Sequence, residues 1–331
     1  MKRWALALAA IGLLSPCWAW GQTDAVGNAA AGKTEAPIEV GKVHWNRDFE
    51  HATQLSRESG KPMFVLFQEV PGCAGCQQFG REVLSEPLLV EAIEGEFVPV
   101  VIYNNRDSGS DARLLARFQE PSWNYQVVRF LDDKGEDIIP RKDKVWTLDG
   151  IAARMVQALE QAQRTVPKYI VAMAAGSGDA NRYGEAAFAQ HCFWTGEYEL
   201  GHIDGVIATE AGWLDGREVT VVQFDKHQLS LEALIQQASQ SKCADKVYTR
   251  AGGADGSSDV GVLDDSYRRA ETKDQKRQLM NWPDIPGLTK MQATKLNALA
   301  PRDRQAALEW LSPQQRRALK AASNGTPTAN R

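Results

Sequence analysis

The chain has 331 residues, a net charge of −4 at pH 7, 43% hydrophobic residues and 24% charged residues. This composition is typical of globular proteins, and the length allows two ordinary domains with additional segments. The slight excess of acidic over basic residues provides no net positive charge for binding nucleic acid or anionic membranes, so neither is expected as a partner.

The first 21 residues have the pattern of a signal peptide. Residues 2–3 are basic, residues 4–14 form an apolar run, and small residues then precede Gln22. The run is too short for a membrane span, which takes about 20 residues. A lipoprotein signal at Cys17 is an alternative, but Pro16 fits that signal poorly. We therefore expect export, to the periplasm or elsewhere outside the cytoplasm, without stable membrane insertion.

The rest of the chain divides at segments rich in glycine, alanine, serine and aspartate, near residues 174–178 and 251–262. The expected fold class is α/β (α+β), with two domains in series. The expected parts are a signal peptide at 1–21, a flexible lead-in at 22–42, a first domain at 43–170, a second domain at 182–250 and a helical tail at 264–331.

In the first domain, apolar runs predict buried strands and periodic patterns predict helices. The elements expected in chain order are a helix at 47–59, a strand at 63–67, a helix from Cys73 to about Leu84, a strand at 97–103, a strand at 127–131 that enters a hairpin, and a helix at 148–163.

In the second domain, a short strand at 185–189 leads to Cys192. The elements expected after it are a helix at 197–201, paired strands at 206–213 and 217–224, and a helix at 230–241. In the tail, Pro301 and Pro313 are each expected at the start of a helix, where the missing N–H costs nothing.

Cys73 and Cys76 form a Cys-x-x-Cys pair between a predicted strand and a predicted helix. The first sulfur then lies at a helix N-terminus, where the helix dipole favours the reactive thiolate. The alternatives are a structural disulfide or half of a metal site. A zinc site needs further ligands, and no second pair follows at suitable spacing. The context therefore favours a redox-active pair, with no metal or other cofactor.

The segment Val70-Pro71-Gly72-Cys73 and the strand–Cys-x-x-Cys–helix order resemble the thioredoxin superfamily. More narrowly, they resemble thioredoxin-like (seleno)proteins with Val-Pro-Gly before the reactive residue. The resemblance covers about residues 43–165. It implies a cis-proline that faces the sulfurs and contacts substrate, and Pro121 is the matching residue. Gly72 stands where a tryptophan is usual, which leaves redox potential and partner preference open.

Cys192-Phe193-Trp194 suggests a second thiol site. Reduction of a sulfoxide needs a thiolate that attacks sulfur, an acid that protonates the oxygen, and an apolar pocket for the methyl group. Cys192 can attack, while Phe193 and Trp194 can form the pocket. A carboxyl group buried in an apolar strand, as expected for Glu218, stays protonated and can act as the acid. The alternative is a core cysteine beside core aromatic residues.

Three blocks, at 187–197, 205–213 and 217–225, resemble peptide methionine sulfoxide reductases of the A type in the same order. The resemblance covers about residues 184–240 and implies a two-layer domain. It implies Cys192 as nucleophile and Glu218 as acid, with Phe193, Trp194 and Glu197 at the substrate. The chain departs from the family at His191, where the family has glycine, and lacks the tyrosines that hold the substrate oxygen.

Together the two sites predict an exported oxidoreductase that reduces the S epimer of methionine sulfoxide in peptides or proteins, a repair activity. Attack leaves Cys192 as a sulfenic acid, and Cys243 is the candidate resolving thiol. The alternatives for Cys243 are a surface thiol with no role or a permanent partner of Cys192. The Cys73–Cys76 pair relays electrons, and an external thiol donor reduces it again.

Two alternatives belong to other classes. In one, the chain is a thiol–disulfide oxidoreductase acting on exported proteins, and the second domain only binds substrate. In the other, the chain is a non-enzymatic assembly module whose tail, from about residue 264, recruits a partner.

Overall fold

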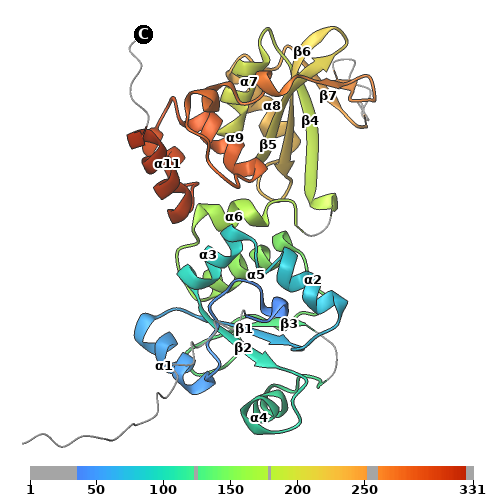
Figure 1. Ribbon diagram of the computed structural model, residues 1–331. Coiled ribbons are helices and arrows are strands. Elements are labelled where there is room, and N and C mark those ends of the chain that lie inside the picture. The colour runs from blue at the N-terminus through green and yellow to red at the C-terminus, as the bar shows by residue number, and fades with distance from the viewer. Residues whose placement is uncertain (1–35, 123–125, 178–179, 252–259, 326–331) are drawn as a thin grey trace, which may run out of the picture. The chain divides into compact units, whose positions relative to one another are not determined.

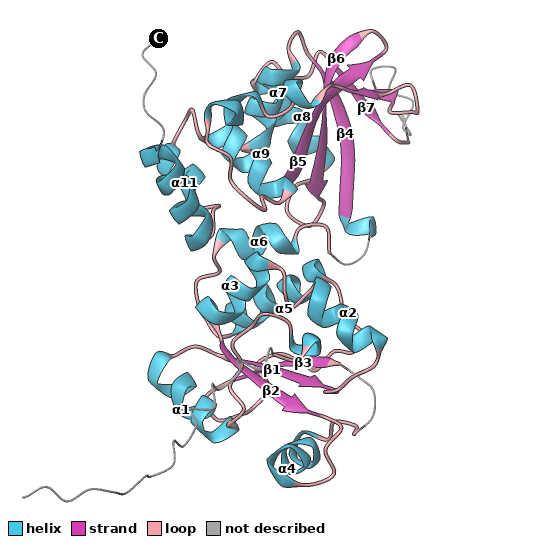
Figure 2. Cartoon of the chain, viewed as in Figure 1, coloured by secondary structure: helices cyan, strands magenta, loops and turns pink. Residues whose placement is uncertain are grey.

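The computed structural model describes residues 36–122, 126–177, 180–251 and 260–325. The predicted signal peptide and most of the predicted lead-in lie outside the described residues. Two separate sheets, each with its own helices, confirm the expected α+β class (Figures 1 and 2). Among the described helices, none is long and apolar enough to cross a membrane.

The first sheet, as described, has the strand order β2–β1–β3. Its central strand β1 (Met63–Gln68) pairs in parallel with β2 (Val98–Tyr103) and antiparallel with β3 (Val127–Leu131). Every residue of β1 is buried, as its apolar run predicts. Side chains alternate along a strand, so Phe64 and Leu66 pack into one core while Val65 packs into another on the opposite face.

Helices cover both faces of this sheet (Figure 2). Helices α2, α3, α5 and α6 pack on the face of Phe64, and α1 and α4 pack on the opposite face. Their bounds are α1 (Phe49–Ser59), α2 (Ala74–Glu82), α3 (Pro87–Glu96), α4 (Gly109–Phe118), α5 (Leu148–Gln161) and α6 (Lys168–Ala174), with a 3-10 turn η1 (Ile38–Val40) before α1.

The second sheet, as described, has the order β8–β7–β4–β6–β5–β9. Its centre is antiparallel, and the predicted pairing of the strands on either side of residues 215–216 is confirmed. The strand bounds are β4 (Tyr183–Ala189), β5 (Val206–Leu214), β6 (Arg217–Asp225), β7 (Lys246–Thr249), β8 (Val260–Val262) and β9 (Arg268–Arg269).

Helices α7 (Phe193–Gly201) and α8 (Leu231–Gln240) pack on one face of this sheet. The helix predicted at 197–201 therefore begins four residues earlier, directly after Cys192. The remaining elements are η2 (Ala180–Arg182), η3 (Thr272–Asp274), η4 (Arg277–Asn281), α9 (Lys290–Leu299), α10 (Arg304–Leu308) and α11 (Pro313–Gly325).

The segment from residue 264 onward packs against the second sheet. Strand β9 pairs with β5, and α9 contacts both α7 and β5. Buried Lys295 on α9 donates to the carbonyl oxygen of Ile203 at 2.7 Å. Pro313 begins α11 as predicted, whereas α10 begins at Arg304 rather than Pro301, because Asp303 caps it by accepting from the N–H of Ala306.

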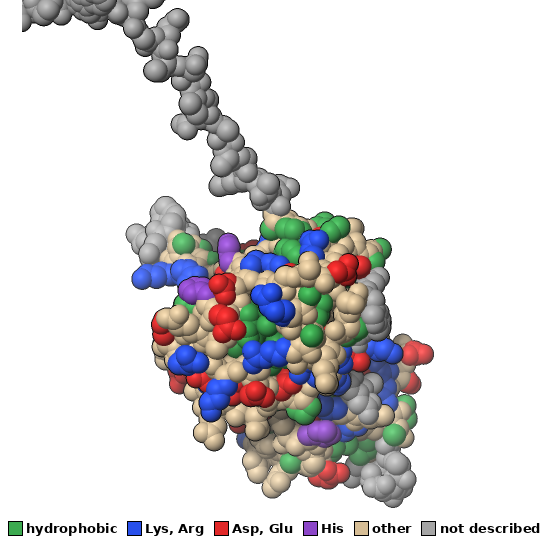
Figure 3. Space-filling model, turned by 90° about the horizontal axis from the view of Figure 1, so that it is seen from below, with side chains coloured by type: hydrophobic (Ala, Val, Ile, Leu, Met, Phe, Trp, Pro, Cys, Tyr) green, Lys and Arg blue, Asp and Glu red, His purple; other side chains and the backbone are tan. Residues whose placement is uncertain are grey.

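One face of the molecule, viewed in Figure 3, carries acidic and basic side chains interspersed with apolar ones. Charges of both signs lie side by side over this face. Such mixing produces no single-sign field across the face drawn.

Candidate active site

Cys73 and Cys76 lie at the start of α2, directly after the loop that leaves β1. Cys73 is the N-cap residue, and its sulfur accepts a weak hydrogen bond from the N–H of Cys76 at 3.5 Å. The two Sγ atoms are also 3.5 Å apart, well beyond the ~2.05 Å of a disulfide, so the pair is a dithiol. The predicted strand–Cys-x-x-Cys–helix arrangement is present.

The two sulfurs have different environments. Cys73 is half-buried, whereas Cys76 is fully buried. Burial raises the pKa of the Cys76 thiol from 9.0 to about 12, with a further rise from its hydrogen bond to Cys73. Cys76 therefore holds its proton at neutral pH, and Cys73 is the sulfur that a second molecule can reach.

The loop before Cys73 is held by side chains from distant segments. Buried Glu39 accepts the N–H of Gly72 at 2.9 Å. Asn105 donates to the carbonyl oxygen of Pro71 at 3.2 Å, and Arg106 donates to that of Val70 at 3.1 Å. These contacts fix the backbone from which Cys73 begins the helix.

The expectation of a cis-proline at Pro121 is wrong. Among the described residues, the cis peptide bond is the one between Val70 and Pro71. Pro121 is half-buried and precedes residues that the structure does not describe. A contact between Pro121 and substrate stays a prediction.

Glu69 lies close to both sulfurs. One carboxylate oxygen and the two Sγ atoms all lie within 4.8 Å of one another, a set of three potential metal ligands. A structural zinc site uses four ligands, so this set lacks one ligand. The negative charge of the Glu69 carboxylate also contributes to raising the pKa of the Cys76 thiol.

Gln126 connects the dithiol to a groove on the surface. Its side-chain oxygen accepts from the Cys76 thiol at 3.8 Å, and its carbonyl oxygen accepts the indole N–H of Trp146 at 3.2 Å. Cys73, Gln126 and Trp146 all line this groove, whose volume is about 540 Å³.

The second thiol, Cys192, is half-buried at the N-terminus of α7. Glu218 on β6 accepts the N–H of Phe193 at 2.8 Å, so its carboxylate lies next to the residue that follows the sulfur. The structure thus brings Cys192 and Glu218 together, although Glu218 is half-exposed rather than buried.

Aromatic rings surround Phe193. Its ring meets Trp194 and Trp213 edge-to-face at centroid distances of 5.8 and 5.5 Å. Trp194 donates its indole N–H to the carbonyl oxygen of Asp274 at 3.0 Å. Phe193, Trp194 and Trp213 therefore form one aromatic cluster at the start of α7, with Trp213 as an additional member.

Glu197 does not lie where the sequence predicts. It is fully buried, and its carboxylate accepts the N–H of Lys276 at 2.7 Å and forms an ion pair with the Lys276 ammonium group. Thr209 donates a further hydrogen bond at 3.4 Å. These contacts place Glu197 in the core, where it holds Lys276, so the structure gives no support for its expected place at a substrate.

Cys243 is fully buried in the core between α8 and the second sheet. Burial raises the pKa of its thiol to about 11, with smaller contributions from Glu199, Asp245 and Cys192. In this conformation Cys243 is a protonated core thiol.

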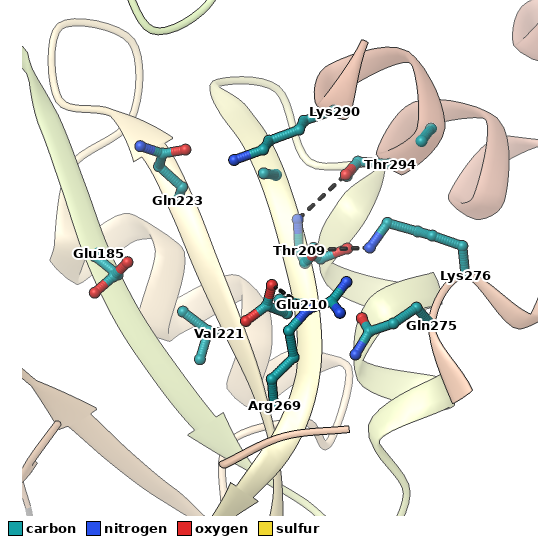
Figure 4. Close-up of a pocket in the computed structure, with 12 residues that line it drawn as sticks. Glu185, Thr209, Glu210, Val221, Gln223, Arg269, Gln275, Lys276, Lys290 and Thr294 are labelled. Atoms are coloured by element: carbon teal, nitrogen blue, oxygen red, sulfur yellow. Dashed lines mark hydrogen bonds and ion pairs between the residues drawn. The ribbon is translucent and has the colours of Figure 1, made fainter. Parts of the chain in front are cut away.

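A separate hollow of about 310 Å³, which Cys192 does not line, lies on the second sheet (Figure 4). Figure 4 shows Glu210 beside Arg269, an ion pair at 2.8 Å, and Lys276 beside Thr209. Tyr267 also donates to Glu210 at 2.8 Å. The charges of this hollow are thus largely neutralised by neighbouring side chains.

A buried strand, a dithiol that begins the next helix, and helices on both faces of the sheet define a thioredoxin-like redox domain. In agreement, residues 44–132 match a protein-family model described as thioredoxin-like. The chain therefore contains a thioredoxin-like domain in its N-terminal part.

A curated relative is the thioredoxin-related protein DsbJ of Chlamydia pneumoniae, which is 30% identical over 60 residues. The match covers 18% of this chain and 17% of the relative, so the chain spans about a sixth of the relative's length. A solved structure titled DsbH Oxidoreductase aligns over 39% of this chain and 90% of its own, at 16% identity. Its TM-score of 0.30 is too low to establish a shared fold.

Sequence reasoning missed several residues that shape these sites. Gln126 contacts the Cys76 thiol and Glu39 contacts the backbone of Gly72 before the dithiol, both from segments far along the chain, and Trp146 contacts Gln126. Lys276 reaches Glu197 across 79 positions. The exposed Trp146, between two polar segments, was the one local signal that could have pointed to a surface role.

Proposed function

We propose that this protein is a thiol–disulfide oxidoreductase that acts through Cys73 and Cys76. The observation that carries the proposal is the pair of sulfurs 3.5 Å apart, one half-buried at the start of α2 and the other buried and protonated. The match of residues 44–132 to a thioredoxin-like model supports it. The pattern of residues 1–21 supports export, and hence exported proteins as partners.

The reaction proceeds by two exchanges. The Cys73 thiolate attacks one sulfur of a substrate disulfide, the substrate S–S bond breaks, and the released thiolate takes a proton. Cys76 then loses its proton, for which the Glu69 carboxylate is the nearby acceptor, and attacks the Cys73 sulfur. A Cys73–Cys76 disulfide forms and the second substrate thiol leaves. Two electrons have passed to the substrate, and an external thiol donor reduces the pair again.

A trapping experiment tests this proposal. In Cys76→Ser the second exchange is blocked, so a peptide disulfide should accumulate as a mixed disulfide on Cys73. The adduct should be absent in Cys73→Ser. Added to the Cys76→Ser protein, the matched control substitution Cys192→Ser should leave trapping at Cys73 intact. Absence of any adduct on Cys73 in the Cys76→Ser protein would refute the proposal.

A second candidate function is reduction of the S epimer of methionine sulfoxide at Cys192. The specific observation that favours it is the Glu218 carboxylate bonded to the N–H of Phe193, beside the thiol and an aromatic cluster. The cluster offers an apolar surface for the methyl group, and Glu218, when protonated, supplies the proton for the oxygen.

The chemistry of this second function needs two thiols. Attack of Cys192 on the sulfoxide sulfur transfers the oxygen to Cys192 and leaves a thioether and a sulfenic acid. The Cys243 thiol condenses with the sulfenic acid, which forms a Cys192–Cys243 disulfide and releases water. Because Cys243 is fully buried, α8 or the loop after it has to open for this step. The Cys73–Cys76 dithiol then reduces the new disulfide.

Turnover of a methionine sulfoxide peptide, resolved by epimer and driven by dithiothreitol, tests the second function. The S epimer should be consumed by the wild type and not by Cys192→Ser. Equal turnover in both proteins, or none in the wild type, would eliminate sulfoxide reduction at Cys192 and leave the first proposal untouched.

A further inference from the structure

We propose that the groove between Cys73 and Trp146 binds the partner segment that flanks the target disulfide, with an apolar side chain of that segment on the exposed ring of Trp146. The proposal rests on the thiol–disulfide oxidoreductase function and names the kind of substrate that the site selects.

The groove has an apolar floor beside the reactive sulfur. Phe79 and Val83, both buried members of the main core, line it together with Cys73, Gln126 and Trp146. Its volume of about 540 Å³ lies within the ~300–1,000 Å³ range of ligand-binding clefts. The groove therefore has room for a few side chains of a bound segment.

Trp146 presents its apolar part to solvent. The side chain is 42% exposed, one of few large apolar side chains in the described chain with such exposure. Its indole N–H already donates to the carbonyl oxygen of Gln126. The polar atom is thus satisfied within the protein, so the exposed surface is ring carbon, which gains free energy when an apolar side chain covers it.

Gly75, which lines the groove, has no side chain that could cover the reactive sulfur. A Cβ atom at Gly75 would already lie 3.7 Å from the Cys73 Sγ, so a larger residue there would extend over the sulfur on the groove side. On the rim, Gln78 donates to Glu82 at 2.9 Å, and the Glu82 carboxylate disfavours acidic segments.

Gln126 connects the bound segment to the dithiol. It accepts from Cys76 through its side chain and from Trp146 through its backbone. A segment bound at Trp146 therefore lies close to Gln126, which contacts the buried Cys76 thiol. Anchoring the segment at one end orients its disulfide at Cys73, which lowers the entropic cost of the exchange.

The test uses two peptides, each with one cysteine in mixed disulfide with glutathione, that differ only in leucine or serine two positions from that cysteine. The second-order rate of exchange is measured with full-length protein. The wild type should prefer the leucine peptide by about tenfold, the order expected for partial burial of one leucine. Trp146→Ala should bring the ratio close to one, and Trp146→Phe should retain most of the preference.

Ile38→Ala is the matched control, because Ile38 is similarly exposed at 45% but does not line the groove, and it should keep the wild-type ratio. An unchanged ratio in Trp146→Ala, or no preference in the wild type, would overturn the proposal. Exchange of the wild type with glutathione disulfide separates the two hypotheses. If that reaction occurs without peptide preference, only the groove proposal fails; if it is absent, the oxidoreductase function fails.

Discussion

A Cβ atom added to Gly72 would lie 2.7 Å from the Cβ atom of Cys76 and 2.4 Å from the carbonyl oxygen of Glu69. The backbone before the reactive cysteine therefore passes directly over the buried thiol, and only glycine leaves the space. This approach explains why glycine, and not a residue with a side chain, occupies this position.

Gly72→Ala should consequently destabilise the thioredoxin-like domain. The backbone at Glu69 cannot yield as a flexible side chain would, so we expect a loss of about 1–3 kcal/mol in the free energy of unfolding. Urea denaturation of the reduced protein measures it. Gly75→Ala is the control, since its Cβ atom would meet the Cys73 Sγ at an ordinary 3.7 Å. Equal stability of the two variants would contradict the close packing described.

The buried Cys76 thiol should make the stability of the reduced protein depend on alkaline pH. Its pKa in the folded state, about 12, lies above its ordinary value of 9.0. Between these values the folded protein holds a proton that the unfolded chain releases, so folding loses stability as pH rises. The contribution is fully present below pH 9.

The measurement is the difference in unfolding free energy between wild type and Cys76→Ala in dithiothreitol, at several pH values. The difference should be constant up to about pH 9. As pH rises from there toward 12, the unfolding free energy of the wild type should fall relative to that of Cys76→Ala. A difference that does not vary with pH would show that the Cys76 thiol is not buried.

The buried pair of Glu197 and Lys276 should be sensitive to loss of either partner. Glu197 is fully buried, and removal of Lys276 leaves its charge uncompensated, which costs about 3–5 kcal/mol in comparable pairs. Lys276→Met should therefore destabilise the second domain strongly, and the double variant with Glu197→Gln should recover much of the loss. Urea denaturation of Lys276→Met, Glu197→Gln and the double variant measures the coupling.

Lys273→Met is the matched control for that pair. Lys273 and Glu271 form an ion pair on the same segment, but their side chains are 72% and 74% exposed. Solvent screens such a pair, so we expect no measurable change in stability. A similar effect of both substitutions would argue against a special role for the buried pair.

Two substitutions of Glu218 should distinguish its structural role from its chemical role. Its hydrogen bond to the N–H of Phe193 caps the start of α7, so Glu218→Ala should cost about 1 kcal/mol of stability. Glu218→Gln keeps an acceptor oxygen at the same place and should retain most of that stability. If Glu218 supplies a proton to a sulfoxide, Glu218→Gln should still lose turnover. Equal turnover in Glu218→Gln and wild type would leave Glu218 as a cap alone.

Much of the fold follows from local sequence patterns. The strands at 63–67, 127–131, 206–213 and 217–224 were predicted to within one residue, because continuous or alternating apolar residues define them. Helices α3, α4 and α6 were missed, as were strands β7, β8 and β9. The strands are short and exist through pairing with neighbours, which a local pattern does not reveal.

The site residues also fall into those that the local sequence predicts and those that depend on tertiary contacts. The dithiol depends on a spacing of three residues after a strand, which is visible in sequence. Glu197 was expected at the substrate because the segment at 187–197 resembles the nucleophile segment of the reductases. In α7, however, it lies one turn beyond Phe193 on the same buried face, and its partner comes from a segment 79 residues away. Contacts of that kind depend on the tertiary fold.

The most direct test of the central claim is the rate at which the reduced full-length protein exchanges with a peptide disulfide. We predict rapid reduction by the wild type and by Cys192→Ser, and loss of activity in Cys73→Ser. Mass spectrometry of the product should show a Cys73–Cys76 disulfide. Undiminished reduction by Cys73→Ser, or a product disulfide that does not include Cys73, would contradict the account.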